Sequence, residues 1–120
     1  MADDDSSLNS DLEELHSSLI KRVAELSDAI SQAADSDTVD AIITEIAEVN
    51  HRVTLVGNLL FTQQTRKVSD QMKQVRDATA DVQRAIKKLE GITELVKGVT
   101  SYLTLVDKVI DTAKLVLPTV

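Results

Sequence analysis

Apolar residues recur at intervals of three or four positions along most of this chain, and this spacing restricts its fold more than any other feature. Such intervals place apolar side chains on one face of an α-helix, whereas a half-buried strand alternates every second residue. The chain of 120 residues contains only 3 glycines, 1 proline and 2% aromatic residues. So few turn formers and aromatic residues argue against a sheet with tight turns. We therefore predict an all-α fold.

The first predicted helix covers residues 11–34. Its apolar positions follow one another at spacings of three and four: Leu12, Leu15, Leu19, Val23, Leu26, Ile30 and Ala34. Ser10 and Glu13 match the S-x-x-E capping box, which predicts that the helix begins there. The acidic residues 1–9 are expected to be disordered. Asp35 and the three residues after it are good N-caps and poor interior residues, so they predict a short turn.

Two architectures fit residues 38–90, which contain two heptad runs. The first run is Val39, Ile42, Ile46, Val49, Val53, Val56 and Leu60, and the second is Val68, Met72, Val75, Thr79, Val82, Ile86 and Leu89. Residues 61–66 contain no glycine, proline or asparagine, so we expect one continuous helix of about 80 Å, at 1.5 Å per residue. A break near 62–66 would instead give two helices of similar length. Gly57 and Asn58 also fit a β-hairpin turn, but the heptad passes through them, which favours a helix.

The last predicted helix covers residues 92–117. Gly91 follows two lysines, as at a helix C-terminus, and Pro118 ends the final helix. One apolar row contains Ile92, Val96, Val99, Leu103, Val106, Ile110, Ala113 and Leu117, and a second contains Leu95, Tyr102, Val109 and Val116. Residues 10–118 are thus predicted to form one domain, an antiparallel, coiled-coil-like bundle of long helices. It has three helices if 38–90 is continuous and four if that segment breaks near 62–66.

Charge is distributed unevenly along the chain. Residues 1–48 contain 13 acidic residues but only Lys21 and Arg22 as basic ones, whereas residues 66–90 contain seven basic and four acidic residues. The acidic half is therefore expected to attract the basic segment of its own chain or a basic partner. The basic segment has no aromatic residue to stack on a nucleobase, so we expect no binding to nucleic acid.

No set of residues predicts catalysis or a cofactor. The chain has no cysteine, which excludes thiolate chemistry and is typical of a cytoplasmic protein. Glu13-x-x-His16 and Glu48-x-x-His51 match half of a di-iron carboxylate site. The heptads place these side chains away from the core, so we expect surface histidines and no metal. No glycine-rich phosphate loop or nucleophile elbow occurs in the sequence, and we expect a non-enzymatic protein.

The apolar rows predict a function in protein–protein interaction. We expect a scaffold that associates with itself, or with a basic protein, through the contact residues Leu95, Tyr102, Val109, Val116, Val53, Leu60 and Phe61. The alternative is a membrane-active helical protein, such as a pore-forming toxin component or a cell-death-type bundle, whose apolar helices unpack onto lipid. The longest uncharged run, residues 53–65, has 13 residues. A membrane-spanning helix needs about 20, so the interaction scaffold is favoured over the membrane-active protein.

Overall fold

Four helices make up the computed structural model of this chain, which describes residues 2–62 and 67–114. They are α1 (Ala2–Ile30), α2 (Ser36–Thr62), α3 (Ser69–Lys88) and α4 (Ile92–Lys114). No strand occurs within the described ranges. The predicted all-α fold is confirmed, and the segment around Gly57 is helical rather than a β-hairpin.

The continuous helix predicted over residues 38–90 does not occur. α2 ends at Thr62, residues 67 and 68 are not helical, and α3 begins at Ser69. The longest dimension of the molecule is 52 Å, which is too short for the length of about 80 Å that 53 helical residues need. Of the expected junction near residues 62–66, Thr62 is the last residue of α2, and residues 63–66 lie outside the described residues. The chain therefore follows the alternative with separate helices on either side of this junction.

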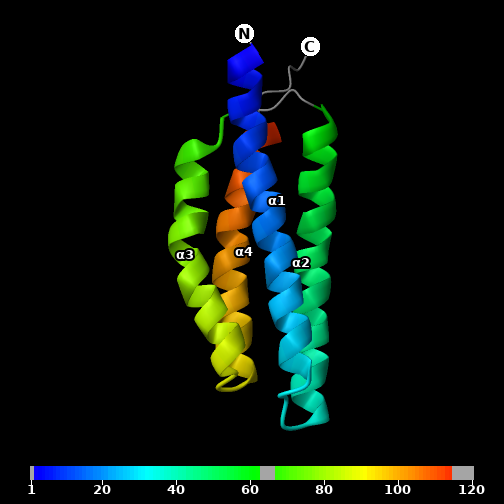
Figure 1. Cartoon of the computed structure of the whole chain (residues 1–120). Helices are drawn as coiled ribbons and strands as arrows, with labels where there is room; N and C mark the ends of the chain where they lie inside the picture. Colours follow the sequence, from blue (N-terminus) through cyan, green and yellow to red (C-terminus); the bar gives the residue numbers. More distant parts are fainter. Residues whose placement is uncertain (1, 63–66, 115–120) are drawn as a thin grey trace.

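The helices form two antiparallel hairpins that pack side by side (Figure 1). α1 pairs with α2, and α3 pairs with α4; between the hairpins, α1 contacts α3 and α2 contacts α4. In Figure 1, α1 and α3 run in one direction while α2 and α4 run in the other. The contacts between the hairpins therefore join parallel helices, although antiparallel packing was expected. This difference arises because α2 and α3, which follow one another in the chain, lie diagonally across the bundle. They are therefore not antiparallel neighbours, and each hairpin packs on the other through parallel helices.

The turn between α1 and α2 has the capping chemistry that its sequence predicts. The carboxylate oxygen Oδ1 of Asp35 accepts hydrogen bonds from the Thr38 backbone N–H at 2.8 Å and from the Thr38 hydroxyl at 2.7 Å. These bonds satisfy a free N–H at the start of α2 and lower the pKa of Asp35. Asp35 is therefore the N-cap of α2.

The start of α1 differs from the prediction. The helix extends back to Ala2, so Ser10 lies inside it and does not act as its cap. Disorder of residues 1–9 in solution stays a prediction.

The end of α3 lies where the sequence predicts it, but a different residue takes the left-handed conformation. Leu89 has φ 46° and ψ 52°, and its N–H donates to the Ala85 carbonyl at 3.3 Å. Leu89 also packs against the core, which favours this unusual conformation for a leucine. Gly91 has φ 154°, a value that glycine adopts most readily, so both residues shape the turn into α4.

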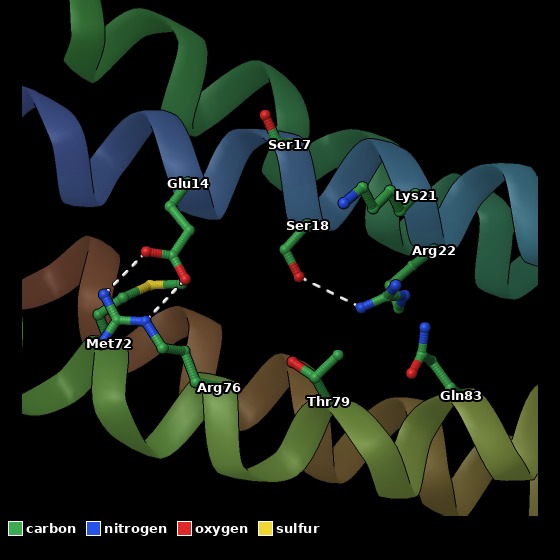
Figure 2. A pocket seen from close by; sticks show the side chains of 9 residues that line it. All are labelled: Glu14, Ser17, Ser18, Lys21, Arg22, Met72, Arg76, Thr79 and Gln83. Atoms are coloured by element: carbon green, nitrogen blue, oxygen red, sulfur yellow. Dashed lines mark hydrogen bonds and ion pairs between the residues drawn. The ribbon is translucent and has the colours of Figure 1, made fainter.

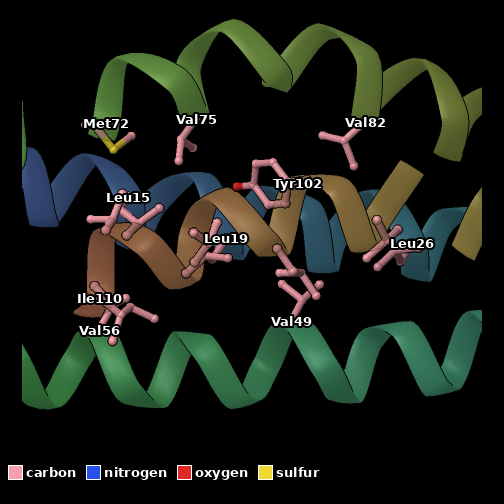
Figure 3. Packing of buried hydrophobic residues seen from close by; sticks show 14 of the residues in the cluster. Leu15, Leu19, Leu26, Val49, Val56, Met72, Val75, Val82, Tyr102 and Ile110 are labelled. Atoms are coloured by element: carbon pink, nitrogen blue, oxygen red, sulfur yellow. The ribbon is translucent and has the colours of Figure 1, made fainter. Parts of the chain in front are cut away.

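The core lies along the axis of the bundle, and all four helices contribute to it (Figure 3). The heptad predicted for α3 is confirmed, because Val68, Met72, Val75, Val82 and Ile86 are buried. Thr79 lies in the same row, and its hydroxyl donates to the Val75 carbonyl at 2.9 Å. This bond within the helix satisfies the hydroxyl without a partner from another helix.

α3 and α4 approach each other closely at Gly98. A Cβ atom added to Gly98 would lie 2.6 Å from the Cβ atom of Ala85. This distance is far below van der Waals contact, and the Ala85 methyl group cannot rotate away because it is attached directly to the backbone. The absence of a side chain at position 98 therefore sets the spacing of the second hairpin.

We expect Gly98→Ala to lower the free energy of unfolding by about 1–3 kcal/mol, because overpacking forces the helices apart. Gly57→Ala is the matched control, since its added Cβ would lie 3.6 Å from His16 Nε2, an ordinary contact. That variant should gain about 0.5–1 kcal/mol from better helix propensity. Urea unfolding followed by circular dichroism measures both effects, and Ala85→Gly should rescue Gly98→Ala. Equal stabilisation by the two alanines would contradict the close approach.

Candidate functional site

Three of the four residues predicted to form an exposed contact row lie in the core instead. Leu95, Tyr102 and Val109 are at most 1% exposed, and Val116 lies outside the described residues. α4 contacts both α3 and α2, so the described residues of this row are covered by the same chain. The prediction that Leu95, Tyr102 and Val109 are exposed is therefore wrong. It assumed that the other helices of the chain would leave the second apolar row of α4 uncovered.

The other predicted contact residues lie in the second half of α2. Val53 and Leu60 are half-buried against the core, whereas Phe61 is 87% exposed. One exposed aromatic side chain is small compared with the apolar patches that mark interfaces. A contact role for these three residues stays a prediction.

A buried arginine occupies the core-facing row of α1. From Ser10 onward, the buried positions of this helix are Leu12, Leu15, Leu19, Arg22, Leu26 and Ala29. Arg22 is only 2% exposed, while Val23, which was predicted to fill this position, is half-buried. A charge at this depth is tolerated only when it is paired and hydrogen-bonded.

Three side chains hold the guanidinium of Arg22. Its Nε and Nη2 atoms donate to the two carboxylate oxygens of Glu25 at 2.8 and 3.2 Å. Its Nη1 atom donates to Ser18 Oγ at 3.2 Å. The Arg22 Cζ atom lies 5.9 Å from the centre of the Tyr102 ring. The positive charge is thus balanced by a bidentate carboxylate and by the face of an aromatic ring.

These contacts continue onto the other hairpin. Ser18 Oγ and Tyr102 Oη are 2.6 Å apart and share a hydrogen bond, and Gln83 Nε2 donates to Glu25 Oε2 at 3.0 Å. Burial raises the pKa of Tyr102, which keeps the phenol neutral. We call Ser18, Arg22, Glu25, Gln83 and Tyr102 the Arg22 network. It connects α1 with both α3 and α4.

A groove between α1 and α3 opens onto this network (Figure 2). Its volume is about 310 Å³, and it is lined by Glu14, Ser17, Ser18, Lys21, Arg22, Met72, Arg76, Thr79 and Gln83. At one end, Arg76 donates to the Glu14 carboxylate at 2.7 and 2.8 Å and to Asp11 at 3.2 Å. The hydrogen bond from Arg76 lowers the pKa of Glu14. The acidic helix α1 and the basic helix α3 thus attract each other here, and these charges are paired within the chain.

A second buried charged residue, Glu45, lies in the core-facing row of α2. Glu45 is 6% exposed and takes the position predicted for Ile46, which is half-buried. Within the part of the chain that the structure describes, no hydrogen bond or ion pair reaches the Glu45 carboxylate. Burial raises the pKa of Glu45, and repulsion from Glu48 raises it further, against an opposing effect of Arg52.

Glu45 lines a groove between α2 and α4, which we call the α2–α4 groove. Its volume is about 290 Å³, and its other walls consist of Thr44, Glu48, Arg52, Thr100, Leu103, Thr104 and Asp107. Arg52 bridges the two helices, because Nε and Nη2 donate to the Asp107 carboxylate at 3.0 Å each and Nη1 donates to Glu48 Oε1 at 2.7 Å. Three carboxylates face one guanidinium, so the groove is negatively charged when Glu45 is ionised.

Arg22 and Glu45 were missed in the sequence because only apolar residues were used to trace the core-facing rows. At each position the apolar neighbour, Val23 or Ile46, was assigned to the core. The signal is nevertheless present: when charge is ignored, both residues continue the three-four spacing of the flanking apolar positions. A regular spacing interrupted by one charged residue therefore marks a buried charge.

The two Glu-x-x-His motifs do not come together. Glu13, Glu48 and His51 are exposed, and His16 is half-buried on the side of α1 that faces Gly57. Their expected placement outside the core is confirmed. Among the described residues, no group of three or more histidine, aspartate or glutamate side chains is arranged to hold a metal ion.

No protein-family model matches this chain, and no curated protein or solved structure matches it. In the described ranges, none of the helices combines the length and the apolar character needed to cross a membrane. The two grooves and the distribution of charge are therefore the features of this molecule that bear on its function.

We expect Arg22→Ala to lower the free energy of unfolding by about 3 kcal/mol, because it leaves a cavity and removes the partner of Glu25. Lys21→Ala, at the exposed neighbouring position, should change it by less than about 0.5 kcal/mol. Chemical denaturation of the two variants and the wild type provides the comparison. Similar small effects at both positions would show that the Arg22 network does not stabilise the bundle.

We expect Glu45→Gln to stabilise the protein at neutral pH and to make its stability less dependent on pH. The raised pKa means that the folded state holds the Glu45 proton more tightly than the unfolded state does. The contribution of Glu45 is therefore most favourable below its ordinary pKa of about 4.3 and is lost as the pH rises through the raised value. The advantage of the glutamine variant should grow as the pH rises from about 4 toward neutrality, and it should level off above the raised pKa.

Unfolding curves recorded across this pH range measure the effect. Glu13→Gln removes an exposed carboxylate from the same hairpin and is the control, with a stability difference that stays small throughout. A glutamine variant at position 45 that is less stable than the wild type at neutral pH would mean that the carboxylate is satisfied in solution.

Proposed function

We propose that this protein is a non-enzymatic helical interaction module, a scaffold whose acidic first hairpin binds a basic protein partner. In this proposal the bundle is a rigid support with coiled-coil-like packing along its heptads, and it works in the cytoplasm, as the lack of cysteine predicted. The supporting observation is that the arginines of the α1–α2 hairpin are paired with carboxylates, whereas many of its acidic side chains are exposed.

The basic residues of this hairpin are largely occupied by carboxylates. Arg22 is paired with Glu25, and Arg52 is paired with Glu48 and Asp107. Many acidic side chains stay on the surface, and four of them surround the turn between the helices: Asp28, Asp35, Asp37 and Asp40. We call these four residues the acidic tip. A concentrated negative surface of this kind steers positively charged partners and raises their rate of association.

A basic partner is supported better than a second copy of the chain. Self-association was expected because a helix of 53 residues would leave much of its apolar row uncovered. In the four-helix arrangement, most described residues of the apolar rows are buried or half-buried within one chain, so this reason no longer supports self-association. Self-association itself stays a prediction.

Binding to a fluorescent decalysine peptide, measured by anisotropy, tests the proposal. The wild type should bind with an affinity that falls as salt is added. The triple variant Asp28→Asn/Asp37→Asn/Asp40→Asn should bind about tenfold more weakly, since it removes three charges from the acidic tip. It keeps Asp35, the N-cap of α2.

The matched control removes three exposed acidic residues from the other hairpin, in the variant Asp77→Asn/Glu90→Gln/Asp111→Asn. Its net charge equals that of the tip variant, so a local effect of the tip is separated from overall charge. Equal weakening by both variants, or no binding by the wild type, would count against the proposal. Dye release from liposomes by the wild type would favour the membrane-active alternative instead.

A further inference from the structure

We infer that the α2–α4 groove binds the side chain of a lysine from the basic partner, with the ammonium group placed on Glu45. This inference rests on the proposed function, and it identifies the chemistry that the partner must present. It is carried by the buried carboxylate of Glu45, by the hydrogen-bonding character of the groove walls and by the position of the groove next to the acidic tip.

The first observation is the state of Glu45. Glu45 is only 6% exposed and is thus more than nine-tenths buried. It also lines the groove. Within the described residues, its carboxylate has no hydrogen-bond or ion-pair partner. A buried charge is usually paired, and leaving one unpaired costs folding free energy. A partner supplied from outside the chain removes this cost when it binds.

The second observation is that the groove walls present hydrogen-bond acceptors. The Thr44 hydroxyl donates to the Asp40 carbonyl at 3.0 Å, and the Thr104 hydroxyl donates to the Thr100 carbonyl at 2.9 Å. Their protons are therefore used, and their oxygen lone pairs are left for a ligand. The nitrogens of Arg52 all donate to Glu48 or Asp107. A group that only donates hydrogen bonds fits these walls best.

An ammonium group meets this requirement and also matches the charge of the groove. It carries three N–H donors and no acceptor, whereas an anion or a carbonyl would face oxygen atoms of the same polarity. The aliphatic stem of lysine can lie along Leu103 and the methyl groups of the threonines, as such stems commonly do on apolar surface. The planar fork of arginine needs a carboxylate presented edge-on for two bonds, and Arg52 already binds Asp107 in that way.

The third observation is the location of the groove. Asp37 and Asp40 of the acidic tip lie on α2 and precede Thr44, Glu45 and Glu48 along the same helix. A basic segment attracted to the acidic tip would therefore reach the groove by following α2. In this inference, the acidic tip attracts the basic segment at a distance. Glu45 then binds the ammonium group of one lysine in that segment.

The test compares decalysine with decaarginine, which carries the same charge, on the wild type and on Glu45→Gln. The wild type should bind decalysine more tightly, and Glu45→Gln should weaken decalysine binding about tenfold while changing decaarginine binding little. Glu45→Gln is expected to fold at least as well as the wild type, so a loss of binding is not a loss of structure. Glu13→Gln removes the same charge from an exposed site of the same hairpin and is the matched control.

A second variant blocks the groove without changing its charge. Thr104→Met places a longer side chain on the α4 wall at an exposed helical position and should also weaken decalysine binding several-fold. Carbon-13 NMR of the glutamate carboxyl groups gives an independent measurement, because the bound ammonium should shift the Glu45 titration toward lower pH.

The outcomes separate this inference from the proposed function. If the acidic-tip variant loses affinity but Glu45→Gln and Thr104→Met bind decalysine like the wild type, the protein binds basic partners and the lysine groove is wrong. Tighter binding of decaarginine to the wild type would also overturn the lysine assignment. If the wild type binds neither peptide, the proposed function fails, and the inference that depends on it fails as well.

Discussion

Every helix of this protein has one apolar face, and the structure depends on covering four such faces within a single chain. Isolated amphipathic helices are marginal in water, so packing provides most of their stability. Two hairpins provide the local contacts, and docking of α1 on α3 and of α2 on α4 encloses the rest. The close approach of Gly98 and Ala85 and the turn at Leu89 and Gly91 both serve this enclosure. Leu95, Tyr102 and Val109 of α4, which packs against both α3 and α2, are consequently core rather than contact surface.

The sequence correctly predicted those features that depend on residues close to one another in the chain. Asp35 caps α2 through bonds to a residue three positions away, and the heptad of α3 reports its buried face directly. The separation of α2 from α3 could not be predicted in this way, because residues 61–66 contain no helix breaker. A single long helix would have left apolar surface in water, and only the contacts between distant segments decide against it. Long-range packing therefore overrides the local preference here.

The candidate site was the least predictable part, because it consists of charged residues at positions where apolar ones were expected. Arg22 and Glu45 lie in the core-facing rows of neighbouring helices, yet they meet different partners. Arg22 is surrounded by Glu25, Ser18 and Tyr102, whereas Glu45 faces a groove. Buried polar groups can fix the register of a bundle at some cost in stability. The satisfied arginine fits such a structural role, and the unsatisfied glutamate fits a role in binding.

The diagonal relation of α2 and α3 has a consequence for how the molecule is assembled. Each hairpin closes through contacts between helices that follow one another in sequence, so each half contains its own local interactions. The interactions that hold the halves together join separate halves of the chain, as in Arg76 with Glu14, Arg52 with Asp107 and Ser18 with Tyr102. A single cut between α2 and α3 would thus leave two fragments with complementary charges and complementary apolar faces. In its architecture, the single chain resembles two different helical hairpins that have been joined by one connection.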